Sequence, residues 1–204
     1  MADLSPTPTL PVPTTPAEGE AVPPLRMRGL ELRPVIPADY DYLRRAELSD
    51  ALGPRWRHRG ATPSPERFAE TLWTGVLAQF IVQRPDLPVG VCTCYNADFQ
   101  NSHAYIAAAK FQPGDLRTEF VEGCITFIEY VFACWNFTKL YLETVEFNVH
   151  QMVGGLGDLC EPEGRFRNHV FQQDRYWDLI TLALYRDEWR KRAIYELVAR
   201  RRRT

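Results

Sequence analysis

The sequence predicts an α/β (α+β) protein built on a mixed, mostly antiparallel twisted sheet of about seven strands flanked by helices. Short runs of alternating apolar residues indicate the strands, and several are separated only by turn residues, which favours antiparallel hairpins. One strongly helical segment, 118–135, lies between two such runs and predicts a parallel pair. The 204 residues are 45% hydrophobic and 25% charged, an ordinary composition for one good-sized domain.

In the first half of the chain, strand-like runs enclose two predicted helices. Residues 30–36 alternate like a strand, and Pro37 then begins an amphipathic helix, where its missing N–H costs nothing. Ser64 and Pro65 are residue types that cap and open helices, so we expect a second helix over 64–80. Three strands should follow in succession, at 80–84, 88–96 and 102–111.

The second half is organised around the helix predicted over 118–135, whose apolar side chains recur at helical spacing. A strand follows at 139–147, and three glycines then make 148–158 at best a broken helix. The domain should close with a hairpin formed by 163–173 and 175–189, followed by a basic helix.

Three regions differ in composition. Residues 1–25 hold seven of the sixteen prolines and cannot bury enough apolar surface to offset ordering, so we expect this segment to be disordered. Residues 26–189 form the folded domain, and 190–204 form a basic C-terminal helix or tail. Residues 186–204 carry eight Arg or Lys against three acids, which indicates either an anionic partner or a solvated chain end.

The chain has the features of a cytoplasmic protein. Its N-terminus lacks a basic signal-peptide region, and no run of about 18 apolar residues predicts a membrane span. The five cysteines should therefore be reduced thiols. Cys92 and Cys94 share one strand face and are expected to be buried. No further cysteine pair has zinc-like spacing, so we expect no metal site.

Three phrases, in order and at the right spacing, carry a family resemblance. LELRPVIPADYDYLRRAE, VEGCITFIEYVFACWNFTKLYLETVEFN and EGRFRNHVFQQDRYWDLITLALYRDEW are similar to segments of the GNAT acyltransferase superfamily, within its ribosomal-protein N-acetyltransferase-like branch. The resemblance covers about residues 28–189. It implies a GNAT-like sheet and transfer of an acyl group from a thioester to an amine. Acyl-CoA would be a co-substrate, and no cofactor would be bound permanently.

The resemblance also implies a donor loop of the form Arg/Gln-x-x-Gly-x-Gly/Ala, and here that loop is degenerate. The motif positions fall on Asp115, Thr118 and Phe120, none of which matches. The candidate donor-binding residues are Arg117, Thr118 and Asn148. Without glycine the amides approach a phosphate less easily, and Asp115 and Thr118 can instead simply cap the helix.

Acylation of an amine needs a base for the ammonium proton. The candidates are Glu143 and Glu146 on the strand 139–147, together with His103 and His169. Alternation along that strand places Glu143 on the face opposite Glu146. Each carboxylate is also of a type that commonly lies on a solvated surface.

A loop between the first two helices combines basic residues with a tryptophan. In the family this loop borders the acceptor, and such a pattern suits either a carboxylate-bearing acceptor or RNA. The candidate acceptor-binding or RNA-binding residues are Arg55, Trp56, Arg57, Arg59, Tyr176, Asp178, Arg200, Arg201, Arg202 and Arg203.

Three functions remain open from the sequence. The first is an N-acyltransferase that uses acyl-CoA and a small-molecule or peptide amine. The second is a GNAT-fold enzyme whose donor is aminoacyl-tRNA or a carrier-bound acyl group, with tRNA bound through the basic segments. The third is a non-catalytic GNAT-fold binding protein. A homodimer is compatible with each, and none requires a membrane.

Overall fold

The computed structural model describes residues 25–27, 29–49, 52–54, 56–85, 87–111, 117–150 and 159–191. The Pro-rich segment expected over 1–25 and the basic segment expected over 190–204 lie almost wholly outside these residues. The domain boundaries therefore stay predictions.

The described strands form one eight-stranded sheet in the order β1-β2-β3-β4-β5-β6-β8-β7. Every neighbouring pair is antiparallel except β5 and β6, so the predicted mixed sheet is confirmed. The strands are β1 Leu25–Met27, β2 Leu30–Pro34, β3 Val76–Gln83, β4 Pro88–Asp98, β5 His103–Lys110, β6 Lys139–Val145, β7 Cys160–Gln172 and β8 Arg175–Tyr185. The strand beyond the expected seven is the short β1.

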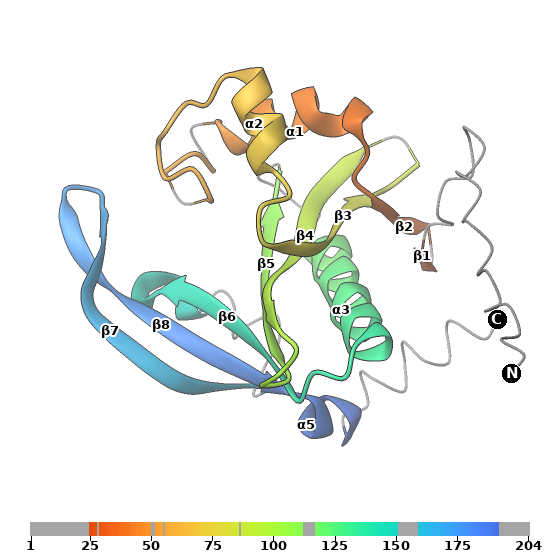
Figure 1. Cartoon of the computed structure of the whole chain (residues 1–204), viewed down its shortest axis with the longest axis vertical. Helices are drawn as coiled ribbons and strands as arrows, with labels where there is room; N and C mark the ends of the chain where they lie inside the picture. Colours follow the sequence, from red (N-terminus) through yellow and green to blue (C-terminus); the bar gives the residue numbers. More distant parts are fainter. Residues whose placement is uncertain are drawn as a thin grey trace, which may run out of the picture.

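Helices cover both faces of the β2–β5 half of the sheet (Figure 1). The helix α3, which is the one expected over 118–135, covers one face through a large apolar core. On the other face α1 and α2 pack on a smaller core that includes Leu43, Phe68 and Ile81. The helices are α1 Tyr40–Glu47, α2 Pro65–Thr71, α3 Arg117–Cys134 and α5 Arg186–Lys191, with short 3-10 turns at Pro37–Asp39 and Glu146–Asn148.

The second predicted helix is wrong in its length. α2 ends at Thr71, and residues 76–83 form β3 instead of continuing the helix. Gly75 has a left-handed φ of 68°, which turns the chain out of the helical path. The run from Ala78 to Val82 is buried throughout, and a short apolar run fits either a helix or a buried strand.

The end of β6 also differs from the prediction. The strand stops at Val145, and Glu146 begins a 3-10 turn, so the strand expected over 139–147 is two residues shorter. The predicted contrast between two faces of one strand therefore does not apply to Glu146. The closing hairpin is confirmed, although β7 begins at Cys160 and α5 takes over after Tyr185.

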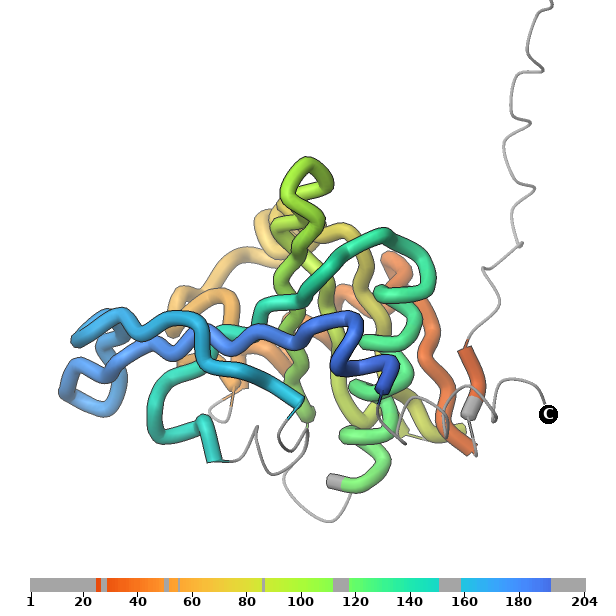
Figure 2. Tube along the Cα trace, turned by 90° about the horizontal axis from the view of Figure 1, so that it is seen from below, coloured from red at the N-terminus to blue at the C-terminus, as the bar shows by residue number. Residues whose placement is uncertain are grey.

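The sheet opens between β5 and β6. These parallel strands pair at three positions only, from His103 opposite Lys139 to Tyr105 opposite Tyr141. Beyond them β5 continues to Lys110 beside β4, and β6 continues to Val145 beside β8. The two halves of the sheet thus diverge as a V, with the β7–β8 hairpin extending away from β3–β5 (Figures 1 and 2).

The cysteines behave as buried thiols where the prediction placed them. Cys92 and Cys94 are free and buried in the core beneath α3. The Cys92 sulfur lies 3.8 Å from that of Cys124 on α3. Burial raises the pKa of Cys94 to about 12, which keeps it as a thiol. Within the described ranges no three His, Cys, Asp or Glu side chains are grouped as a metal site, and none of the helices described is long and apolar enough to cross a membrane.

Candidate functional site

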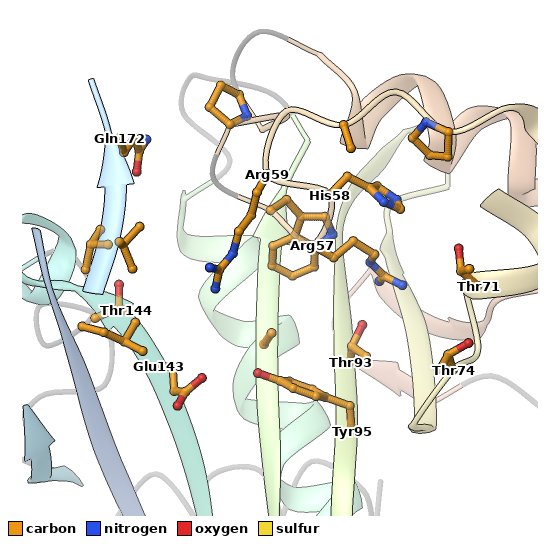
Figure 3. A pocket seen from close by; sticks show the side chains of 18 of the residues that line it. Arg57, His58, Arg59, Thr71, Thr74, Thr93, Tyr95, Glu143, Thr144 and Gln172 are labelled. Carbon is orange, nitrogen blue, oxygen red and sulfur yellow. The ribbon is translucent and has the colours of Figure 1, made fainter. Parts of the chain in front are cut away.

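A cleft of about 840 Å³ lies at the open end of the V. Ala107 of β5 and Glu143 of β6 both line it, and both lie beyond the last paired position of their strands. One wall comes from the loop between α1 and α2. The other comes from β6 and from residues 170–172 of β7 (Figure 3). The cleft therefore exists because the two strands stop pairing.

Glu143 and Tyr95 face one another across the floor of the cleft (Figure 3). The Glu143 side chain is exposed to solvent, whereas Tyr95 is half-buried. Burial, and then the negative charge of Glu143, raise the pKa of Tyr95 to about 12. Its hydroxyl therefore stays protonated at neutral pH and can donate a hydrogen bond into the cleft.

A buried carboxylate stands behind the loop wall. Glu47, at the end of α1, has an exposed fraction of 0%. Its Oε2 atom lies 3.2 Å from Nε of Arg57 and 3.5 Å from Nε2 of His58. Burial raises the pKa of Glu47 even though the Arg57 charge lowers it, and burial likewise lowers the pKa of Arg57. Burial, followed by the Arg57 charge, lowers the pKa of His58, which is therefore neutral at neutral pH.

Arg57 is tied to the sheet as well as to Glu47. It donates hydrogen bonds from Nη2 to Oε1 of Gln79, at 2.6 Å, and from Nη1 to the carbonyl of Leu72, at 3.1 Å. The Thr93 hydroxyl donates to the same Gln79 oxygen at 3.0 Å. This network fixes the guanidinium against the cleft wall and leaves its charge compensated by a buried carboxylate.

Of the four predicted base candidates, only Glu143 lines the cleft. His103 lies at the start of β5 and packs edge-on against Tyr105 and Tyr141. His169 is exposed on β7. Glu146 pairs with Arg165 at 3.2 Å, on the 3-10 turn after β6.

Two predicted acceptor residues lie on the β7–β8 hairpin outside the cleft lining. Asp178 accepts hydrogen bonds from Nε of Arg165, at 2.5 Å, and from the Asn168 amide, at 2.8 Å. The hydrogen bond from the Asn168 backbone amide, and then the one from Arg165, lower the pKa of Asp178. They span an irregular stretch of β7, so this residue holds the hairpin in shape. Tyr176 is exposed and packs on Phe171, a lining residue.

On the donor side, the structure places only part of the predicted loop. Residues 112–116 and the side chain of Arg117 lie outside the described residues, whereas Thr118 is exposed in the first turn of α3 and Asn148 lines the cleft. The Phe120 side chain turns toward the sheet. Its ring lies so close to Gly90 that a Cβ built there would be only 2.6 Å from it. The Phe120 ring therefore packs against β4.

In the predicted basic loop, Arg57, Arg59 and Trp56 all line the cleft. Arg55 and residues 200–203 lie outside the described residues. The sequence reasoning missed Glu47, Gln79 and Tyr95. Tyr95 could have been found, because it and Thr93 place two polar side chains on one face of the predicted strand. Glu47 and Gln79 could not, because nothing in their local sequence reveals that they meet Arg57.

No family model matches the chain, and no curated protein matches it. Solved structures do. The spermidine N-acetyltransferase of Vibrio cholerae, in complex with CoA and spermine, matches at 17% identity with a TM-score of 0.68, over 79% of this chain and 98% of that one. A probable GNAT-family acetyltransferase from Chromobacterium violaceum matches at 18% identity with a TM-score of 0.66, over 81% and 92% of the two chains. The splayed mixed sheet of this chain is thus the fold of the GNAT acyltransferases.

Proposed function

We propose that this protein is an N-acyltransferase that moves an acyl group from acyl-CoA to an amine. The observation that carries the proposal is the position of Glu143, a carboxylate at the open end of the V and in contact with the cleft. A thioester that enters between β5 and β6 would bring its carbonyl to this point. The similar fold of an enzyme solved with CoA and spermine supports the same pairing of donor and amine.

The geometry supports a simple sequence of steps. Glu143 takes one proton from the ammonium group of the acceptor, and the free amine attacks the thioester carbonyl carbon. Backbone amides of β5 beyond Tyr105 have no partner on β6 and can donate to the developing oxyanion. The C–S bond then breaks, and the second amine proton passes to the departing sulfur. Tyr95 can donate a hydrogen bond to that sulfur without giving up its proton.

The start of α3 supports a site for the CoA phosphates despite its unusual sequence. The first amides of an 18-residue helix have no partner within the helix itself and can bind an anion, and the helix dipole favours one there. Phe120 is turned onto Gly90, and Glu119 lies 3.7 Å from Arg84, which offsets its charge. Thr118 and Asn148 remain our proposed donor contacts.

The alternative donors have less support. Arg57 is held in an ion pair with the buried Glu47, so it is not presented to a nucleic acid, and Trp56 is half-buried in the cleft wall. Arg55 and residues 200–203 lie outside the described residues. No observation in the described part of the chain favours tRNA or a carrier protein over acyl-CoA.

The donor is tested by thermal unfolding of the full chain with acetyl-CoA, beside the same measurement with total charged tRNA. A ligand at 100 times its Kd adds about 2.7 kcal/mol to the folded state, which for a chain of this size raises Tm by about 5–10 °C. We expect that rise with acetyl-CoA. A rise with charged tRNA alone would replace acyl-CoA as the donor, and no rise with either would remove the proposed activity.

A further inference from the structure

The charged groups that face the cleft indicate what kind of amine it accepts. Among the described residues, two of the three arginines that line the cleft are already paired with a carboxylate. Arg57 is paired with Glu47 behind the wall, and Arg67 lies 3.2 Å from Glu70 at the exposed rim. His58 is neutral at neutral pH, because burial and the Arg57 charge lower its pKa. None of these side chains adds a free charge to the cleft.

The remaining charged groups among the described residues of the cleft lining are Arg59 and Glu143. Within the described part of the chain, neither side chain has a hydrogen-bond or ion-pair partner. Arg59 reaches from the loop into the space between the two halves of the sheet, and Glu143 points into the same space from β6 (Figure 3). One uncompensated cation and one uncompensated anion therefore face a single cleft from different walls.

The rest of the described cleft lining is neutral, and it is partly polar and partly apolar. Tyr95 and Thr144 contribute hydroxyl groups, Gln172 contributes an amide, and Ala107 and Val145 are apolar. Such a surface can orient a polar molecule but adds no net charge. A ligand with one positive and one negative group would satisfy both Arg59 and Glu143, whereas a polyamine would place an extra positive charge beside Arg59.

We infer that the acceptor carries a carboxylate as well as its amine, in the manner of an amino acid or a short peptide, with the carboxylate on Arg59 and the amine on Glu143. This inference rests on the proposed function, since it assigns the acceptor of the same site. The planar guanidinium of Arg59 can bind a carboxylate through two parallel hydrogen bonds. Arg59 thus determines specificity and takes no part in the chemical step.

The backbone conformation at Arg59 suits substitutions that test this role without a change in backbone strain. Its φ of 47° lies in the left-handed region, and its amide donates to the Trp56 carbonyl at 3.0 Å. Arg59→Gln and Arg59→Lys keep a non-glycine residue, so neither adds a new kind of backbone cost. Arg45 is exposed on α1 away from the cleft, and Arg45→Gln makes the same charge change as a control.

The experiment compares acetyl transfer to matched pairs of acceptors, each a free amino acid and its amide: glycine, β-alanine, leucine and phenylalanine, with spermidine as a further arm. Transfer is followed as CoA thiol released from acetyl-CoA, and binding as the change in Tm with each acceptor. We expect kcat/KM for the best acid to exceed that for its amide by about 10- to 100-fold. Arg59→Gln should remove the difference, Arg59→Lys should keep part of it, and Arg45→Gln should keep all of it.

Other outcomes separate the two proposals. Transfer to amides or spermidine at least as fast as to the acids would overturn carboxylate recognition and leave acyl transfer intact. Binding of the acids that depends on Arg59, without any transfer, would support the acceptor class and count against the proposed reaction. Equal behaviour of Arg59→Gln and wild type towards every pair would also overturn the role of Arg59.

Discussion

At the residue scale, the strongest electrostatic constraint in the described structure is the burial of Glu47. Its carboxylate is removed from water at 0% exposure and meets one guanidinium at 3.2 Å. A buried pair of this kind adds little net stability, but removal of one partner leaves the other charge buried and unpaired. Glu47 thus acts on the cleft indirectly, because it decides whether Arg57 can stay in the wall.

Arg57→Gln should therefore destabilise the fold by about 3 kcal/mol at pH 7, measured by urea unfolding, because the buried Glu47 carboxylate loses its partner. Arg67→Gln is the matched control, since Arg67 belongs to an exposed pair with Glu70, and it should cost less than about 0.5 kcal/mol. An equal effect of the two variants would mean that breaking the buried Glu47 pair costs no more stability than breaking a surface pair.

The same variant has a pH signature. Burial raises the pKa of Glu47 above its ordinary 4.5, so the folded state keeps the Glu47 proton to a higher pH than the unfolded state does. The stability from that proton is fully present below 4.5 and is lost as the pH rises through the folded pKa. Without Arg57, whose charge lowers the Glu47 pKa, that pKa should lie higher still, so the gap in unfolding free energy between wild type and Arg57→Gln should widen as the pH rises from 4.5. A gap that stays constant or narrows would contradict this account.

At the element scale, α3 approaches the first half of the sheet closely at two glycines. Gly123 makes that approach feasible, because a Cβ built there would lie 2.5 Å from a methyl group of Val82 on β3. Gly90 does the same on β4, where a Cβ would lie 2.6 Å from the ring of Phe120 on α3. These contacts hold the first half of the sheet against the helix whose start we assign to the donor.

Gly123→Ala should destabilise the protein by about 1–3 kcal/mol through overpacking. The better helix propensity of alanine recovers only about 1 kcal/mol of this. Gly164→Ala on β7 is the control, since its Cβ would meet Thr181 at an ordinary 3.4 Å. Chemical unfolding of both variants tests the prediction. A Gly123→Ala variant as stable as wild type would show that α3 and β3 can accommodate a methyl group at this position.

At the scale of the whole molecule, the sequence predicted the fold better than the site. The order of the elements along the chain, the parallel pair and the closing hairpin follow from local sequence patterns. The prediction of the α2–β3 boundary failed because residues 76–80 are apolar except for Gln79, a pattern that suits a helix and a buried strand alike.

The cleft was harder to predict because it is assembled from segments distant in the chain. Glu143 and Glu146 are both base candidates in the sequence. Only the divergence of β5 and β6 shows that Glu143, and not Glu146, lines the cleft. The sequence predicts one acceptor-binding or RNA-binding group in the basic loop, but the fold turns Arg57 toward Glu47 and Arg59 into the cleft. Side-chain direction in a loop depends on tertiary contacts that the local pattern does not contain.

The most direct test of the central claim is the rate of acetyl transfer from acetyl-CoA to the best amine acceptor by wild type, Glu143→Gln and Glu161→Gln. Glu143 and Glu161 are both exposed strand residues, but only Glu143 lines the cleft. Loss of a general base should lower kcat/KM by about 10²- to 10⁴-fold in Glu143→Gln, with Tm nearly unchanged, while Glu161→Gln keeps the wild-type rate. Transfer by Glu143→Gln at the wild-type rate would contradict the account.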